Sequence, residues 1–223
     1  MENKIAEDIY WVGLYFPDIQ ASVNSFLVRD EKTALIDAGA PATSQGIISN
    51  IKTIIDPKEI DYIILTHNDL DHAGGLKDIL SVAPQAQVVA SELEGRMIGM
   101  WGLTVQPKIV KDGERLTLGK HTLRFVATPY VETPGAMVAF EEKEGILFSA
   151  DLLGAAIPQW TLFAHDNLTE PLRQYQAWKL DNSSRAQEAL LKVKDLPINI
   201  VAPSHGLMIK EGIKNYIETL ARQ

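Results

Sequence analysis

Residues 63–75 have the sequence IILTHNDLDHAGG. The apolar residues at its start predict a buried strand that ends at a polar loop, and the glycines at its end predict a tight turn into a helix. The loop holds four potential metal ligands: His67, Asp69, Asp71 and His72. Alternating spacing allows the first three to face one pocket, and His72 can reach a second point in it. Two imidazoles and two carboxylates crowded together are costly without a cation, so the stretch indicates a metal site rather than a solvated acidic loop.

The composition is that of an ordinary globular protein of 223 residues, with 46% hydrophobic and 22% charged residues. No stretch resembles a linker, so we expect a single domain over residues 1–223. The net charge of -8 argues against nucleic acid or an anionic membrane as a partner. The absence of cysteine excludes disulfides, thiolate metal sites and iron–sulfur clusters. The N-terminus is polar and no apolar run is long enough to cross a bilayer, so we expect a cytoplasmic protein.

The hydrophobic pattern predicts alternating strands and helices in the first half and short strands followed by helices in the second. Strands are predicted over residues 9–13, 24–29, 33–37, 62–65, 87–90, 108–110, 115–118, 123–127, 137–140, 146–149 and 198–202. Helices are predicted over residues 43–54, 76–82, 92–100, 172–180, 184–193 and 210–222. Residues 26–39 and 137–151 share a pattern of strand, charged turn and strand ending in Asp. This repeat predicts two sheets packed face to face between helix layers, with a site where loops of the two halves meet.

Three further side chains follow predicted strands and can complete the metal site. They are Glu132 in a proline-bracketed loop, Asp151 after residues 146–149, and His205 before a glycine. Loops at strand ends are the usual place for site residues on a rigid scaffold. Each also has a structural interpretation, as a surface acid, a loop cap and a turn residue respectively.

For other polar and aromatic side chains, the sequence gives less reason to expect a role in the site. We expect His121 to be solvent-exposed in a hairpin turn and His165 to lie at the surface. We expect Asp37, at the end of a strand, to hold backbone groups beneath the site rather than metal. Several large side chains can wall a small dry cavity, but we expect plain core positions for them. They are Tyr130, Trp160, Tyr175, Met97, Met100 and Trp101.

The metal-ligand pattern resembles that of the metallo-β-lactamase superfamily, whose usual motif is His-x-His-x-Asp-His. Residues 67–72, Asp151 and the segment 203–206 (PSHG) carry this resemblance. The chain is more similar to one branch, the diiron domain of flavodiiron proteins, where the motif reads His-x-Glu-x-Asp-His. The similarity extends along essentially the whole chain, at residues 9–13, 31–37, 58–64, 110–113 and 145–149. It implies an α/β fold, the αββα sandwich of the metallo-β-lactamase type.

The resemblance also implies a ligand set for two metal ions. His67, Asp69 and Glu132 would hold the first ion, Asp71, His72 and His205 would hold the second, and Asp151 would bridge both. Three histidines and four carboxylates suit iron or manganese better than a tetrahedral zinc pair. We therefore expect two iron ions joined by an oxo or hydroxo bridge.

Two ligand positions depart from the family pattern. Asp69 stands where the branch usually has Glu, and Glu132 stands where it usually has His. Replacing a neutral imidazole by Glu132 is expected to lower the reduction potential and to stabilise the ferric state. We also expect no flavodoxin domain, and hence no FMN, and no rubredoxin domain among the 223 residues.

In the family, the reduced site reduces O2 or NO with electrons from FMN of a partner subunit. The resemblance therefore implies either an oxygen or redox sensor, like stand-alone oxygen-binding diiron proteins, or a reductase supplied by a separate flavoprotein or rubredoxin. A missing fused donor and an added anionic ligand favour the sensor, with a redox or signalling protein as partner, and the family implies a homodimer. The alternative is a binuclear metallohydrolase that attacks a lactone, thioester or phosphodiester. A scaffold without metal would be expected to have lost ligands, but all seven positions carry coordinating side chains.

Overall fold

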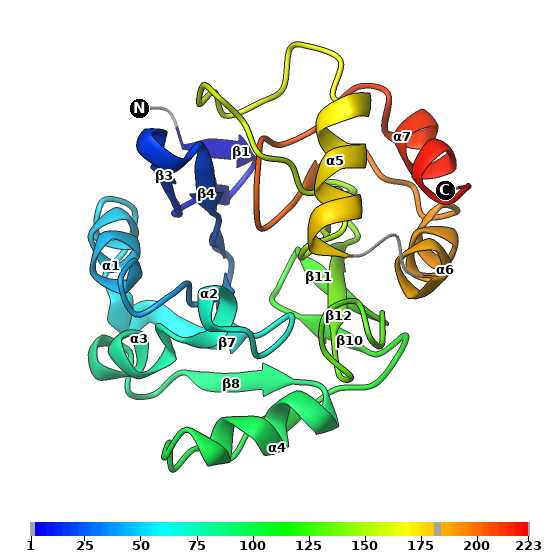
Figure 1. Cartoon of the computed structure of the whole chain (residues 1–223). Coiled ribbons are helices and arrows are strands. Elements are labelled where there is room, and N and C mark those ends of the chain that lie inside the picture. The colour runs from blue at the N-terminus through cyan, green and yellow to red at the C-terminus, as the bar shows by residue number, and fades with distance from the viewer. Residues whose placement is uncertain (1–2, 181–183, 223) are drawn as a thin grey trace.

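Two β-sheets pack face to face, and helices cover the outer face of each, in the computed structural model, which describes residues 3–180 and 184–222 (Figure 1). The first sheet has the order β1 (Lys4–Ala6), β2 (Ile9–Trp11), β5 (Phe26–Val28), β6 (Thr33–Ile36), β7 (Ile60–Ile64), β8 (Gln87–Ala90) and β9 (Lys108–Ile109). The second has the order β10 (Arg115–Thr117), β11 (Thr122–Ala127), β12 (Met137–Glu141), β13 (Ile146–Phe148) and β14 (Ile200–Ala202). The expected αββα fold is confirmed.

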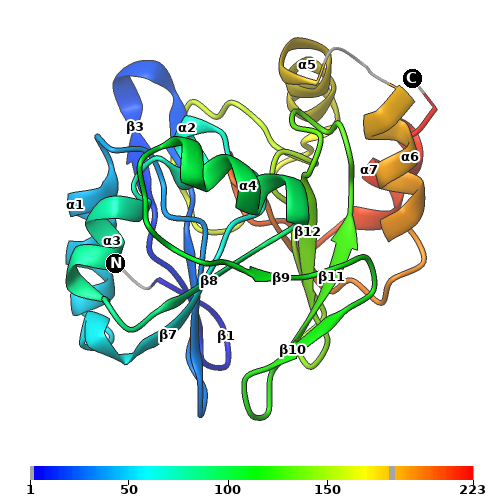
Figure 2. The same cartoon turned by 90° about the horizontal axis from the view of Figure 1, so that it is seen from below.

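Helices lie outside both sheets. They are α1 (Ser44–Lys52), α2 (Leu70–Ala73), α3 (Leu76–Val82), α4 (Glu92–Met100), α5 (Thr169–Lys179), α6 (Ser184–Val193) and α7 (Ile213–Leu220), with short 3-10 turns at Pro17–Ile19 and Pro57–Glu59. Figure 2 shows α1 and α3 on one side of the sheets and α5, α6 and α7 on the other. No helix in the described part of the chain is both long enough and apolar enough to span a bilayer.

Three apolar cores hold the layers together. Phe26 and Phe148 meet between the two sheets, with ring centroids 5.2 Å apart. Ile47 of α1 belongs to the core outside the first sheet, and Leu172 of α5 belongs to the core outside the second. Because each sheet is covered on both faces, strands such as β6 and β13 are buried at every residue. This explains their continuous apolar runs, where a half-exposed strand would alternate.

The repeat in the sequence corresponds to a repeated topology. In the first sheet β5 and β6 are antiparallel and β7 lies parallel to β6. In the second sheet β12 and β13 are antiparallel and β14 lies parallel to β13. Parallel neighbours end at the same edge of a sheet, so the loops after β6 and β7 lie together, as do the loops after β13 and β14. The acidic and histidine-bearing loops therefore meet in pairs.

Local sequence patterns did not predict every element. β1 and the small hairpin of β3 (Leu14–Phe16) and β4 (Ala21–Val23) were missed, because none of these strands has more than one fully buried residue. The histidine loop also contains α2, a helix of four residues, where a turn was expected.

Candidate metal centre

The histidine loop follows β7, and both of its imidazole rings are buried. His67 and His72 are each 1% exposed. The carboxylate of Asp37, which follows β6, lies beneath them: its Oδ1 accepts a hydrogen bond from the backbone N–H of Thr66 at 2.8 Å, and its Oδ2 lies 3.0 Å from His72 Nδ1. Asp37 thus holds the backbone beneath the site as expected, and it orients His72 as well.

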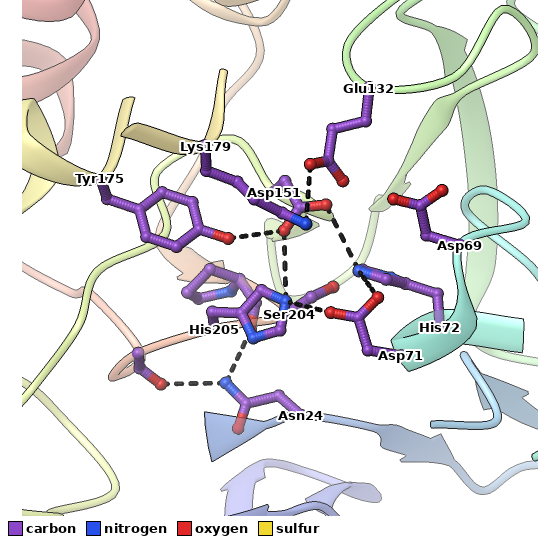
Figure 3. Close-up of polar contacts among 12 residues, drawn as sticks. Asn24, Asp69, Asp71, His72, Glu132, Asp151, Tyr175, Lys179, Ser204 and His205 are labelled. Atoms are coloured by element: carbon purple, nitrogen blue, oxygen red, sulfur yellow. Dashed lines mark hydrogen bonds and ion pairs between the residues drawn. The ribbon is translucent and has the colours of Figure 1, made fainter. Parts of the chain in front are cut away.

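Asp151, which follows β13, lies at the centre of the cluster (Figure 3). Its Oδ2 is 3.1 Å from His67 Nε2 and 3.3 Å from His72 Nε2, and its Oδ1 is 3.3 Å from His205 Nε2. The hydroxyl of Tyr175 on α5 donates to Oδ1 at 2.8 Å. One buried carboxylate therefore faces all three histidines, which come from both halves of the fold.

The two ring nitrogens of His205 have different surroundings. Nδ1 lies 2.6 Å from the carbonyl oxygen of Ser22, which can only accept, so Nδ1 carries the proton. In the neutral ring, Nε2 then presents its lone pair, and Asp71 Oδ2 is 3.1 Å from it. A fixed tautomer with the other nitrogen free is the usual state of a metal-binding histidine.

Glu132 reaches the cluster from the loop after β11. Its Oε2 lies 3.1 Å from His67 Nε2, and its Oε1 lies 2.8 Å from Lys179 Nζ. Glu132 has a left-handed backbone, with φ of 70°. The buried carboxylate of Glu94 stabilises this loop by accepting hydrogen bonds from the hydroxyl of Thr133 and the N–H of Gly135. A strained, well-held loop is typical of functional sites.

Among the residues that the structure describes, potential ligand atoms fall into two groups, each within 4.8 Å. The first contains His67, His72, Glu132 and Asp151, and the second contains Asp71, His72 and His205. The structure does not bring Asp69 into either group. Its side chain is 38% exposed, and its Oδ2 lies 4.0 Å from His67 Nε2.

Burial and mutual attraction shift the pKa values of the central groups. Burial lowers the pKa of His72, but the carboxylates of Asp151 and Asp37 outweigh it and raise the pKa well above the usual value. Burial likewise raises the pKa of the Asp151 carboxyl, but His72 and His67 hold it well below the usual value. The carboxylates of the cluster therefore favour positive charge at His67 and His72, which either protons or metal ions can supply.

The donor atoms fit metal ions better than protons. His72 Nε2, His205 Nε2 and Asp151 Oδ2 are buried and lack a hydrogen-bond partner among the described residues. Because the Nδ1 atoms of both rings face acceptors, their Nε2 lone pairs point toward the same carboxylate. Lone pairs that face a carboxylate with no donor between them require a cation there. Imidazole nitrogens with carboxylates suit divalent transition metals.

A cavity of about 360 Å³ lies beside this cluster. Asp71 and His205 form its polar end together with Tyr175 and Lys179. The rest of the wall comes from Phe16, Ile19, Gln20, Ala21, Ser22, Val23, Ala155, Ala156 and Trp178. The cavity therefore gives a small molecule a mostly apolar path to the second group of ligand atoms.

Some expectations for single residues were wrong. His121 is not exposed: it is 1% exposed, and its Nδ1 lies 3.0 Å from the buried Glu141 carboxylate. His165 is exposed, as expected. Met97, Met100, Trp101 and Tyr130 are not core residues, since 39–76% of each is exposed.

The other two large side chains are less exposed. Trp160 is partly buried and stacks on Trp11, with ring centroids 4.4 Å apart. Tyr175 is buried against Asp151. Lys179 was not predicted from the sequence. The available signal was its position one helical turn after Tyr175, on the same face of α5.

Comparisons with known proteins identify the family and the fold. Residues 21–206 match the family described as ODP family beta lactamase. An uncharacterized protein of Methanocaldococcus jannaschii, MJ0732, is 30% identical over 98% of this chain and 59% of its own length. A nitric oxide reductase of Moorella thermoacetica is 27% identical over 98% of this chain and 60% of its own length. The crystal structure of the flavodiiron protein from Giardia intestinalis superimposes with a TM-score of 0.91 at 23% identity, covering 100% of this chain and 59% of that one. The chain thus spans about three-fifths of these longer proteins.

Proposed function

The chain belongs to the ODP beta-lactamase family, and from this membership we propose that it is a non-heme diiron protein that binds O2 or NO. The observation that carries the proposal is the position of Asp151 between three histidine Nε2 atoms, at 3.1–3.3 Å. Among its relatives, the protein from Moorella thermoacetica is a nitric oxide reductase.

We propose the same ligand set that the resemblance implied, with Asp151 shared between two ions. The first ion would take His67, Asp69 and Glu132, and the second Asp71, His72 and His205. Asp69 is included because its carboxylate lies at the edge of the cluster, 4.0 Å from His67 Nε2. When bound, the iron ions supply both the electrons for reducing a diatomic gas and the positions where it binds.

The protein's own residues prepare the site for this chemistry. Asp37 and the Ser22 carbonyl fix the rings of His72 and His205, so that both present Nε2 to the metal. Because these positions are set by folding, the site needs little rearrangement when metal binds. The apolar walls of the adjoining cavity favour O2 and NO, which are themselves apolar.

Within this function, we propose an oxygen or redox sensor, and as the second form a reductase that receives electrons from a separate flavoprotein or rubredoxin. Glu132 supports the sensor, because an additional anionic ligand stabilises the oxidised metal. We further propose that residues 1–223 form one diiron domain of a cytoplasmic protein that works as a homodimer.

Anaerobic loading with ferrous iron, metal counting and an optical spectrum recorded as O2 is admitted test this proposal. Two irons per chain and a persistent charge-transfer band in the visible would support gas binding and sensing. Two irons that oxidise at once without such a band would favour the reductase. Retention of zinc together with hydrolysis of a lactone, thioester or phosphodiester would overturn the proposal in favour of a binuclear metallohydrolase.

A further inference from the structure

Helix α5 presents two side chains, one turn apart, to Asp151 and Glu132 of the cluster (Figure 3). Tyr175 donates to Asp151 Oδ1, and Lys179 Nζ lies 2.8 Å from Glu132 Oε1. Residues at i and i+4 lie on the same face of a helix, so one rigid element fixes both contacts. Lys179 is the last residue of α5 and also lines the cavity beside the cluster.

The two oxygens of Glu132 have different partners. Oε1 is bound to the ammonium group of Lys179, whereas Oε2 faces His67 Nε2 at 3.1 Å. The side chains of Glu132 and Lys179 are only 10% and 22% exposed. Water and salt therefore screen this ion pair less than a surface pair, and the contact restrains the carboxylate.

We propose that Lys179 is a positioning residue that restricts Glu132 to a single oxygen, Oε2, for metal binding and offsets the negative charge of this ligand. The inference rests on the proposed function, because it requires a metal ion at the cluster. It explains how the site accommodates a carboxylate where the related branch usually has a neutral histidine. Lys179 offsets part of the negative charge of Glu132, whose Oε2 remains an anionic donor toward the metal site.

The sign of the electronic effect follows from Coulomb's law. A positive charge near a redox centre favours the reduced state, which carries less positive charge than the oxidised state. Removing the ammonium group therefore lowers the reduction potential of the iron centre. Releasing Oε1 also allows Glu132 to bind a metal ion through both oxygens, which stabilises the ferric state further.

The test compares the iron-loaded wild-type protein with Lys179→Met, which removes the charge at similar size, and Lys179→Arg, which retains it. Lys192→Met is the matched control, because Lys192 pairs with Asp112 at 3.6 Å on the exposed surface of α6. We expect Lys179→Met to shift the reduction potential to a more negative value. The Arg variant and the control should keep the wild-type potential, and all four proteins should hold two ions.

A crystal structure of the wild-type protein loaded with Mn²⁺ provides a second measurement that does not depend on any variant folding. The expected result is Glu132 bound to metal through one oxygen, with Lys179 on the other. Two Glu132 oxygens on the metal, with Lys179 turned away, would overturn the inference, as would an unchanged potential in Lys179→Met. A wild-type protein that fails to take up two ions would instead contradict the proposed function, before any variant is compared.

Discussion

The Oδ2 atom of Asp37 lies 3.0 Å from Nδ1 of His72, on the side of the ring that faces away from the candidate metal centre. The other oxygen of the same carboxylate accepts a hydrogen bond from the backbone N–H of Thr66. Both contacts use Asp37 as an acceptor, so the proton of His72 is fixed on Nδ1 and its Nε2 is free for metal. One residue at the end of β6 thereby sets the tautomer of a ligand that comes from the loop after β7.

Replacing Asp37 by Asn should weaken the affinity for one metal ion by about 10–100-fold. The amide has only one acceptor oxygen, so its NH2 group must face either Thr66 or His72. Asn tolerates the left-handed backbone of this position, where φ is 58°, so the fold should be retained. Titration with Fe²⁺ or Co²⁺ measures the affinity. Asp61→Asn, which alters a partly exposed pair with Lys32, is the control and should bind metal like the wild-type protein.

The Asp151→Asn variant should fail to bind both metal ions. The change keeps the shape of the side chain but removes the charge shared by His67, His72 and His205. Asp69→Asn is the matched comparison and should affect only one ion, because its carboxylate lies at the exposed edge of the cluster. Counting metals after gel filtration distinguishes these results. Two ions retained by Asp151→Asn would argue against a bridging carboxylate.

Gly206→Ala should disturb the loop that carries His205 and destabilise the protein by about 1–3 kcal/mol. The backbone of Gly206 is left-handed, with φ of 99°, and a Cβ atom there would lie 2.9 Å from the carbonyl oxygen of Ala155. Urea unfolding measures the stability, and metal titration should also show weaker binding. Gly99→Ala is the control: its Cβ would meet no atom within 4 Å, and alanine favours the helix by about 0.5–1 kcal/mol.

The pair of Glu141 and His121, away from the metal centre, should make folding stability depend on pH. Burial raises the pKa of the Glu141 carboxyl, but hydrogen bonds from His121 and from the backbone N–H groups of Glu144 and Lys143 outweigh it, and the pKa lies below the usual 4.5. The folded state thus binds the proton more weakly than the unfolded state. The ionised carboxylate stabilises the fold above pH 4.5, and this contribution disappears as the pH falls through the lower, folded-state pKa.

Glu141→Gln should therefore cost about 1.5–3 kcal/mol near neutral pH, and the difference from the wild-type protein should shrink in acid. Urea unfolding at a series of pH values measures the free energy of unfolding of both proteins. The difference between the two free energies at each pH removes the contribution from titration of the metal ligands, which both proteins share. Glu142→Gln, which alters a surface pair with Arg115, should change stability by at most about 1 kcal/mol. A pH-independent difference would show that Glu141 contributes by packing alone.

Much of the fold could be predicted because its signals are local. Buried strands such as β6 and β13 have continuous apolar runs, and α1 has isoleucines at helical spacing. The repeated pattern of strand, turn and strand ending in Asp predicted two halves, and both halves have the same strand order. The missed strands β1, β3 and β4 have at most one fully buried residue each, so their apolar pattern is weak.

By itself, the sequence determined which residue types are available to the candidate site and which strands they follow. The reason is that the end of a strand and the loop after it depend on residues that are close together along the chain. It did not determine the distances between side chains from remote segments. The contact of Lys179 with Glu132, the exposure of Asp69 and the burial of His121 against Glu141 depend on how the two sheets and α5 pack. Packing is a sum over many distant contacts, so only the tertiary structure decided these three relationships.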